Sequence, residues 1–398
     1  MSRLDGIALW DGTSDRGTVD LHWTGDRIEA VTGSAVARHD GLSVIPGLID
    51  THVHFDTAVA EDGVPPDNAW SIVTSDAEKA LHVAGNAQRF AASGVTTTRD
   101  LAASPVQLAV SRAFDQGVIR GPRLLAYGPV GMTAGHGDLF THPALENRPP
   151  VADGVDECRK LVRRWARAGM HGIKIYTSGG ILSMGDQVGW RNHTDAELEA
   201  ILDESHALGM KVAAHTHSTD GITLALRLGV DSIEHGTGID EAHYAELLDR
   251  RVPVAPTLAV HDVILAGTDP RRADAREKAR RALEPRDPAF RAAADAGVRF
   301  VLGTDANGHL VRYGDQLHEL RLMRDLFGWT DERTLIAGTS DAADAIGLGS
   351  LVGTLAPGFG ADFVVVRGRP WESLEELTPE RIVAVVSRGR VLTGRLPD

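Results

Sequence analysis

The feature that most constrains this chain is a regular alternation of short apolar segments with longer amphipathic ones between residues 46 and 348. Eight of the short segments are rich in apolar and β-branched residues, and segments with helical periodicity separate them, which is the pattern of βα units around a parallel sheet. Eight such units predict a TIM-like (β/α)8 barrel, whose active-site residues lie at the carboxyl ends of the strands. The eight expected strands are Leu48–His54, Val95–Asp100, Arg123–Gly128, Gly172–Tyr176, Val212–Thr216, Asp231–His235, Val252–Thr257 and Val298–Thr304.

The amphipathic segments predict the helices of the barrel. Several follow a Ser, Thr or Asp cap and end at a glycine, as in Thr194 through Gly209, and these are ordinary signals for the start and end of a helix. The expected helices are Asp76–Ala92, Ser104–Gln116, Val155–Ala168, Asp195–Leu208, Asp220–Leu228, Glu241–Arg251, Arg271–Ala296, Gln316–Phe327 and Asp331–Ile346.

Both ends of the chain consist instead of short strand-like segments and turns, such as Val19–Trp23 near the start and Ala361–Val366 near the end. Neither end has enough strands to cover its apolar faces, so we expect the two to pair in one small β-sandwich domain beside the barrel. The expected domains are a barrel over residues 46–348 and a composite β-sandwich built from residues 1–45 and 349–398.

Composition narrows the classes of partner. The chain has 398 residues, 42% of them hydrophobic, which is enough to bury a large core. No apolar segment reaches the ~18 residues of a membrane helix, and no apolar leader follows Met1, so we expect a cytoplasmic protein. The net charge of −14 opposes binding to nucleic acid or to an anionic membrane. We therefore expect a small-molecule substrate, and assembly into a homo-oligomer is left open.

Two local features have simple explanations. The only cysteine, Cys158, lies in an expected helix and cannot form an internal disulfide, so we assign it no role. The arginine-rich segment Arg271–Arg286 is best explained as a solvated helix face, and a lid that faces an acidic substrate is the alternative.

Polar residues stand at the ends of several expected strands, and the geometry of a barrel brings such ends to one mouth. A lysine inside the apolar sequence Gly-Ile-Lys-Ile-Tyr is the oddest of them, because a buried, unpaired ammonium is costly and needs a partner, a lowered pKa or a chemical modification. Addition of carbon dioxide to neutral lysine gives a carbamate, an anionic group able to bridge two metal ions. With that modification the set could supply two zinc-type ions with ligands. Its members are His52, His54, Lys174, His215, His235 and Asp305.

These residues stand in motifs that resemble those of the amidohydrolase superfamily of metal-dependent hydrolases, and the resemblance spans essentially the whole chain. The matching motifs are Pro46–His54, Lys174, His215, Glu234–Gly236 and Gly303–Ala306, and Pro357–Val365 resembles the family's closing strand. The resemblance implies a (β/α)8 barrel that holds two divalent metal ions, which we expect to be zinc. It also implies a role for each ligand: the more buried ion is bound by His52, His54 and Asp305, the more exposed one by His215 and His235, and both are bridged by N6-carboxylated Lys174.

The reaction expected of such a site is hydrolysis of an amide C–N bond. Two metals that share a hydroxide provide a nucleophile at neutral pH. In this hypothesis the exposed metal polarises a carbonyl, the bridging hydroxide attacks it, and Asp305 acts as general base and then as general acid toward the departing nitrogen. Deaminases of the superfamily typically have a glutamate downstream of the strand-five histidine and lack the strand-four lysine. Here the sequence from His215 to Asp220 has no such glutamate, and Lys174 is present.

Within the superfamily, the nearest likeness is to the imidazolonepropionase-like and prolidase-like group, which includes Xaa-Pro and related dipeptidases. The stretches Gly172–Gly180 and Thr133–Asp138 carry this likeness. The segment Leu182–His193 departs from the closest dipeptidase patterns, so the side-chain specificity, and peptide cleavage itself, are left open.

Three further residues are candidates for substrate contact. Tyr176 and His217 each lie two positions beyond an expected ligand, which keeps both on the inward face of their strands. His136 stands in a glycine-flanked loop after strand three, where the backbone can approach a ligand closely, and Asp138 is a weaker candidate beside it. Each has a simpler alternative: Tyr176 could be a packed barrel tyrosine, His217 a residue that orients a metal ligand, and His136 an ordinary turn histidine.

Three functions follow from these residues. The first is a binuclear metal hydrolase that cleaves an amide bond in a dipeptide-like or N-acyl amino acid substrate. The second keeps the metals but hydrolyses a cyclic amide, lactone or carbamate, as an imidazolonepropionase-like enzyme would. The third is a noncatalytic barrel scaffold. Such a scaffold would be expected to lack Asp305 or one of the ligands, and this sequence has all of them.

Overall fold

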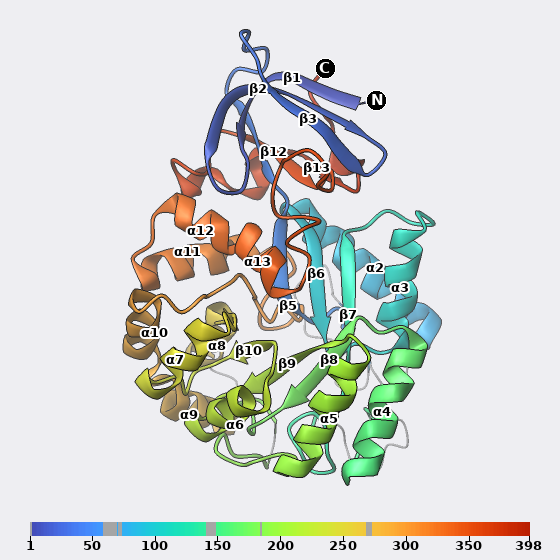
Figure 1. Cartoon of the computed structure of the whole chain (residues 1–398), viewed down its shortest axis with the longest axis vertical. Helices are drawn as coiled ribbons and strands as arrows, with labels where there is room; N and C mark the ends of the chain where they lie inside the picture. Colours follow the sequence, from blue (N-terminus) through green and yellow to red (C-terminus); the bar gives the residue numbers. More distant parts are fainter. Residues whose placement is uncertain (1, 59–69, 71–73, 141–148, 184, 268–272) are drawn as a thin grey trace.

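Two seven-stranded sheets organise the computed structural model of this protein, one above the other in Figure 1. The structure describes residues 2–58, 70, 74–140, 149–183, 185–267 and 273–398. Met184, Arg271 and Arg272, which belong to segments discussed above, lie outside the described residues. Within these ranges, no helix is both long and apolar enough to cross a membrane.

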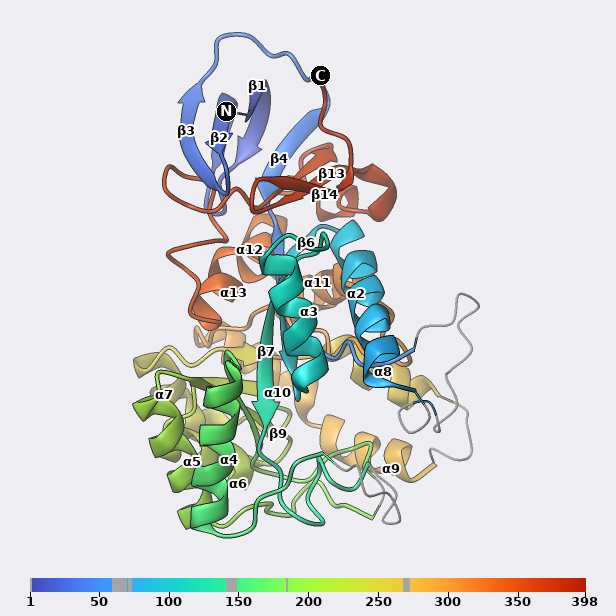
Figure 2. The ribbon, with the colours of Figure 1, turned by 90° about the vertical axis from the view of Figure 1, so that its right-hand side faces the viewer.

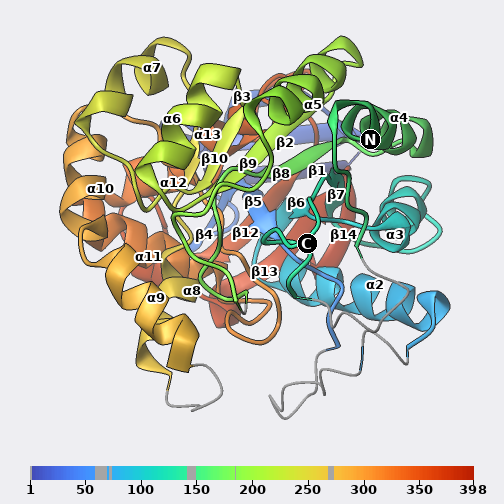
Figure 3. The ribbon, with the colours of Figure 1, turned by 90° about the horizontal axis from the view of Figure 1, so that it is seen from below.

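The larger sheet is parallel, and its strands follow one another in chain order. Every residue of its first two strands is buried, as expected where helices cover a parallel sheet. Figure 3 shows these helices arranged around the strands. The strands are β5 (Leu48–Val53), β6 (Val95–Leu101), β7 (Arg123–Pro129), β8 (Gly172–Tyr176), β9 (Lys211–Thr216), β10 (Ser232–His235) and β11 (Val254–Ala255).

The barrel closes through an irregular segment where an eighth strand was expected. Residues 298–304 form no regular strand, although the amide of Val301 donates to the carbonyl of Val254 (3.0 Å) and the carbonyl of Leu302 accepts from the amide of Thr51 (2.9 Å). The neighbouring strand β11 has only two residues, because Pro253 and Pro256 on either side of it have no N–H to donate. The eighth position is therefore hydrogen-bonded on both sides, but over too few residues to form a regular strand.

The helices follow the predicted order, except that two predicted helices are each divided in two and one observed helix was not predicted. The expected helix 271–296 is divided at Pro285 into α9 and α10, and 331–346 is divided near Gly338 into α12 and α13. The apolar helix α8 was not predicted. The bounds are α2 (Asp76–Ala92), α3 (Pro105–Asp115), α4 (Val155–Ala168), α5 (Asp195–Ala207), α6 (Thr219–Leu228), α7 (Tyr244–Asp249), α8 (Leu258–Ala266), α9 (Ala273–Leu283), α10 (Arg286–Asp295), α11 (Gln316–Phe327), α12 (Asp331–Ala337) and α13 (Ser340–Ala345).

The second sheet combines both ends of the chain in the order β14-β13-β12-β4-β1-β2-β3, antiparallel except where β4 pairs with β1. Its strands are β1 (Ser2–Trp10), β2 (Asp15–Thr24), β3 (Arg27–Gly33), β4 (Leu42–Pro46), β12 (Phe363–Arg367), β13 (Ile382–Ser387) and β14 (Arg390–Gly394). Figures 1 and 2 show this sheet at one end of the molecule, where both termini also lie.

The turn between β4 and β5 joins the terminal sheet directly to the first strand of the barrel. A methyl group at Gly47 would overlap the side chain of Thr96 on β6, so the close packing of this turn requires glycine. The start of β5, and with it the register of His52 and His54, is thus fixed by packing against the neighbouring strand.

Candidate metal and substrate site

The carboxyl end of β5 and the segment after the eighth barrel position form the first candidate metal group. His52, His54 and Asp305 each place a ligand atom within 4.8 Å of the other two. The shortest of these contacts joins His54 Nε2 to Asp305 Oδ1 at 3.1 Å. Burial alone would raise the pKa of Asp305, but the hydrogen bond and charge of His54, with the charge of His52, hold it well below its usual range. Asp305 is therefore an ionised carboxylate among imidazoles.

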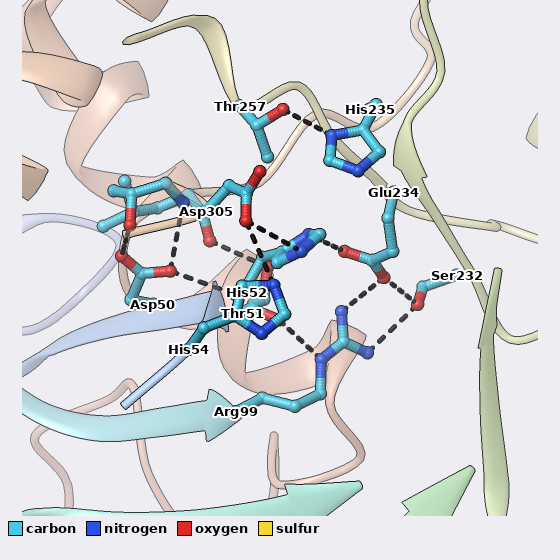
Figure 4. A network of polar contacts seen from close by, with 12 residues as sticks. Asp50, Thr51, His52, His54, Arg99, Ser232, Glu234, His235, Thr257 and Asp305 are labelled. Atoms are coloured by element: carbon cyan, nitrogen blue, oxygen red, sulfur yellow. Dashed lines mark hydrogen bonds and ion pairs between the residues drawn. The ribbon is translucent and has the colours of Figure 1, made fainter. Parts of the chain in front are cut away.

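A buried ion pair lies behind His52 (Figure 4). Glu234 Oε2 lies 2.9 Å from His52 Nδ1, and Glu234 Oε1 pairs with the Arg99 guanidinium at 2.6 Å. Burial would raise the pKa of Glu234, but the charge of Arg99 and the bond from His52 lower it to about 2. Burial lowers the pKa of His52 to about 4, and the Lys174 charge adds to this. A neutral His52 that donates from Nδ1 presents the lone pair of Nε2 to a metal.

The second candidate group comes from β9, β10 and the turn after β9. His215, His217 and His235 place their ligand atoms within 4.8 Å of one another, and all three are buried. His235 Nδ1 lies 2.8 Å from Thr257 Oγ1, and His217 Nδ1 lies 3.0 Å from Thr237 Oγ1.

Burial and the neighbouring charges lower the pKa of each of these three histidines well below its usual value. They are thus neutral and able to donate a lone pair. His215 Nε2 is buried and has no hydrogen-bond partner among the described residues, as expected of an atom that faces a metal.

Lys174 lies on β8, beside the strand β9 that carries His215, and is only 2% exposed. Burial lowers its pKa to about 8, although the charges of Glu234 and Asp305 oppose this shift. Its positive charge in turn lowers the pKa of His52, His215 and His235, which places its amino group within electrostatic reach of both groups. A buried amine with a lowered pKa is the form that adds carbon dioxide, so the residue fits the expected carbamate.

The candidate substrate residues lie beside the second metal group. The ring of His136 stacks on that of His215, with centroids 4.1 Å apart and an angle of 18°. The ring of Tyr176 lies 5.4 Å from that of His136 and 5.8 Å from that of His215. His217 is close enough to His215 and His235 to be a metal ligand as well as a substrate contact, and the sequence had suggested only substrate contact or orientation of a ligand.

Sequence reasoning did not find the residues that support the ligands from behind. Arg99, Thr237 and Thr257 are hydrogen-bonded to Glu234 or to a histidine of the site. His261, on α8, is buried with its ring 5.5 Å from that of His217. Charged residues inside the strands β6 and β10 were the available signal for Arg99 and Glu234, but their partners lie across the barrel.

Backbone strain also collects here. Thr257 and Asp305 adopt φ values of 49° and 55°, and His235 adopts 68°. Left-handed backbone is unfavourable for a β-branched threonine, and it occurs most often where the surrounding structure must aim a side chain. At Thr257 it accompanies the hydrogen bond between the threonine hydroxyl and His235.

The segment that departs from dipeptidase patterns lies beside the site. Asp186 and residues 189–192 of this segment line a cavity of about 340 Å³ together with Met132 and Ala134 from the loop after β7. Trp190 and Arg191, both exposed, belong to its wall.

Comparison with known proteins agrees with this geometry. The Amidohydrolase family profile matches residues 43–392. This chain belongs to the amidohydrolase family. It is an enzyme of that family, a hydrolase that acts on amide bonds, and the resemblance drawn from the sequence motifs is confirmed.

Individual relatives of this amidohydrolase cover nearly all of it. Ochratoxinase from Aspergillus niger is 29% identical over 383 residues, covering 91% of this chain and 78% of its own. Imidazolonepropionase from Deinococcus deserti is 24% identical over 405 residues, covering 94% of this chain and 88% of its own. A crystal structure of a prolidase complexed with N-methylphosphonate-L-proline superposes with a TM-score of 0.86 at 28% identity and covers 99% of each chain.

Proposed function

We propose that this amidohydrolase cleaves the amide bond of a dipeptide-like or N-acyl amino acid substrate with two divalent ions, expected to be zinc, at the barrel mouth. The observation that carries the proposal is the pair of three-residue ligand groups, with the buried Lys174 within electrostatic reach of both. The structural likeness to a prolidase supports a substrate with a carboxylate near the scissile amide. Bound divalent ions supply a Lewis acid for the carbonyl and a water whose pKa is lowered.

The protein's own residues would handle the proton and the orientation of the substrate. Asp305 is ionised and hydrogen-bonded to His54, so it can accept a proton from the attacking water and return it to the departing nitrogen. His136 and Tyr176 lie against His215 of the second ligand group, to which His217 itself belongs, and all three would contact the carbonyl or carboxylate of the substrate.

Asp305→Asn tests the role in proton transfer. The variant keeps the size of the side chain and one ligand oxygen, so we expect retention of most metal with loss of turnover. Metal analysis and a panel of Xaa-Pro, Xaa-Arg and N-acyl amino acids would be measured on the same preparation. Full activity in Asp305→Asn would overturn the assignment. Bound metal in the wild type with no activity on this panel or on any cyclic amide or lactone would favour a noncatalytic barrel.

The carboxylation of Lys174 is a separate part of the proposal. Lys174→Ala should lose metal and activity together, and added short-chain carboxylic acids should restore part of both, because they supply the two missing oxygens. Lys160→Ala, at an exposed lysine of α4, is the matched control and should retain metal. Full metal content in Lys174→Ala without any added acid would contradict a bridging role.

A second candidate is hydrolysis of a cyclic amide or lactone, favoured by the similarity to imidazolonepropionase. Cyclic amides and lactones assayed beside that panel separate the two, since a ring-opening enzyme should turn over the cyclic amides and leave the linear dipeptides unchanged.

A further inference from the structure

The loop after β8 holds His136 at both its backbone and its side chain. The amide of His136 donates to Asn192 Oδ1 (2.8 Å), and His136 Nδ1 lies 2.9 Å from Ser183 Oγ and 3.5 Å from Asp186 Oδ2. All four residues are buried. The loop that carries His136 follows β7, so two separate barrel loops meet at this imidazole.

The donor and acceptor in each of these hydrogen bonds follow from Asp186, the last residue of the series His136, Ser183, Asp186. The Asp186 carboxylate is an acceptor only, and Asp186 Oδ2 accepts from the amide of Gly180 and from Ser183 Oγ, both at 2.7 Å. Because the Ser183 hydroxyl donates its hydrogen bond to Asp186, it faces His136 with its lone pairs. His136 Nδ1 must therefore carry a proton, and Nε2 is the nitrogen left for a ligand.

The plane of the His136 ring is also fixed. A methyl group at Gly180 would overlap the ring, His215 stacks against it, and the rings of Tyr176 and Phe140 meet it edge-on at 5.4 Å and 5.0 Å. These contacts prevent rotation of the His136 ring. Which of its two nitrogens is protonated therefore depends on the hydrogen-bond partners of the ring.

A helix from the far side of the mouth supports the same loop. Lys278 of α9 is buried, and its Nζ donates to the carbonyl of Ser183 (2.6 Å). This lysine lies within the basic segment that the sequence predicts to be a solvated helix face, so one of its cations points inward and anchors the loop.

We propose that Asp186 is a positioning residue which, through Ser183, fixes the protonated nitrogen of His136 and leaves Nε2 to meet the substrate. The inference rests on the proposed function only in that His136 contacts the substrate. A buried partner on the far nitrogen commonly changes activity or affinity by about 10–100-fold in metal sites, and we expect a similar effect here.

The kinetic test uses Asp186→Asn alone and in the His136→Ala background, with the amide substrate that the panel identifies. We expect kcat to fall about 10–100-fold with little change in KM, and the effect of Asp186→Asn to fall below about twofold once His136 is gone. Equal effects in both backgrounds would show that Asp186 acts elsewhere and would overturn the proposal. Asp11→Asn is the matched control, since Asp11 likewise accepts hydrogen bonds from backbone amides and a hydroxyl, but in the connection between β1 and β2.

A spectroscopic test is independent of catalysis. The hydrogen-bonded Nδ1 proton of His136 should give a downfield proton resonance that is lost in His136→Ala, is shifted or lost in Asp186→Asn, and is retained in Asp11→Asn. Ser183→Ala, which breaks the link but keeps the bond between Gly180 and Asp186, should reproduce the shift if Asp186→Asn does not fold. An Asp186-dependent resonance in a protein inactive on every amide would refute the proposed function alone. A wild-type protein without this resonance would refute the positioning role.

Discussion

Glu234→Gln tests whether the buried charges behind His52 are essential to the site. Glu234 pairs with Arg99 at 2.6 Å and lies 2.9 Å from His52 Nδ1, and both Glu234 and Arg99 are almost completely shielded from solvent. Glutamine has nearly the same shape but no charge, so it leaves the guanidinium buried without a carboxylate. It also weakens the group that holds the proton on His52 Nδ1.

The expected cost is large for a single substitution. Removal of one partner from a buried ion pair typically destabilises a protein by about 3–5 kcal/mol, because the remaining charge stays desolvated. The weakened partner of His52 should lower metal affinity by about 10–100-fold, or roughly 1.4–2.8 kcal/mol. Arg99→Met should cost a similar amount of stability, and the double variant should cost less than the sum of the two, since it leaves no unpaired charge.

Urea unfolding of the metal-free protein and competition with a chelator for the metal measure the two effects separately. Glu246→Gln is the control: Glu246 pairs with Arg250 at 2.9 Å on the exposed face of a helix, where such a pair contributes about 0.3–0.5 kcal/mol. Additive losses in the double variant, or a loss for Glu234→Gln no larger than for Glu246→Gln, would refute the reasoning.

Three further predictions concern single residues. Gly180→Ala should lower kcat and destabilise the fold by about 1–3 kcal/mol, because the added methyl group overlaps the His136 ring; wild-type kinetics would show that the loops adjust freely. Burial raises the pKa of Glu319 from 4.5 to about 8. Stability from this group is therefore present below pH 4.5 and lost as the pH rises through 8, by up to ~1.4 kcal/mol per pH unit. Urea melts of the wild type and of Glu319→Gln should differ by this slope, and parallel pH curves would contradict it. Cys158 is fully buried, and burial raises its pKa to about 12, so a thiol reagent should label it only in denaturant; rapid labelling of the native protein would refute this.

The expected ligands could be located from the sequence because strand alternation is a local property. His52 and His54 occupy alternate positions at the end of an apolar segment, and Lys174 interrupts another, so each could be placed on a strand without knowledge of its neighbours. Seven of the eight expected strands are present in the barrel sheet. The family match confirms the class of enzyme, whereas the roles of individual residues stay predictions.

The elements that were not predicted depend on contacts between distant parts of the chain. Helix α8 is mostly apolar and has no side-chain cap of its own. Its first two amides instead donate to the side-chain oxygens of Glu319, on α11, at 2.7 Å and 2.8 Å. The irregular eighth position likewise follows from the shortness of β11, its neighbour. The pairing of Arg99 with Glu234 crosses the barrel interior, and no local pattern contains that information.

The hydrogen bonds of the imidazoles show why such distant contacts matter to the site. The Nδ1 atoms of His52, His235 and His136 have as partners Glu234, Thr257 and Ser183 respectively, and each partner comes from a different part of the barrel. In each case this arrangement leaves Nε2 available at the mouth. The ligand set therefore exists only when the whole barrel is closed, so metal binding should stabilise the native state as a unit. At a free metal concentration one hundred times the Kd, that stabilisation amounts to about 2.7 kcal/mol per independent site. This stabilisation by metal should be smaller in Glu234→Gln, because His52 would then be free to carry its proton on either nitrogen and would have to return to the Nδ1-protonated form before it could bind the metal.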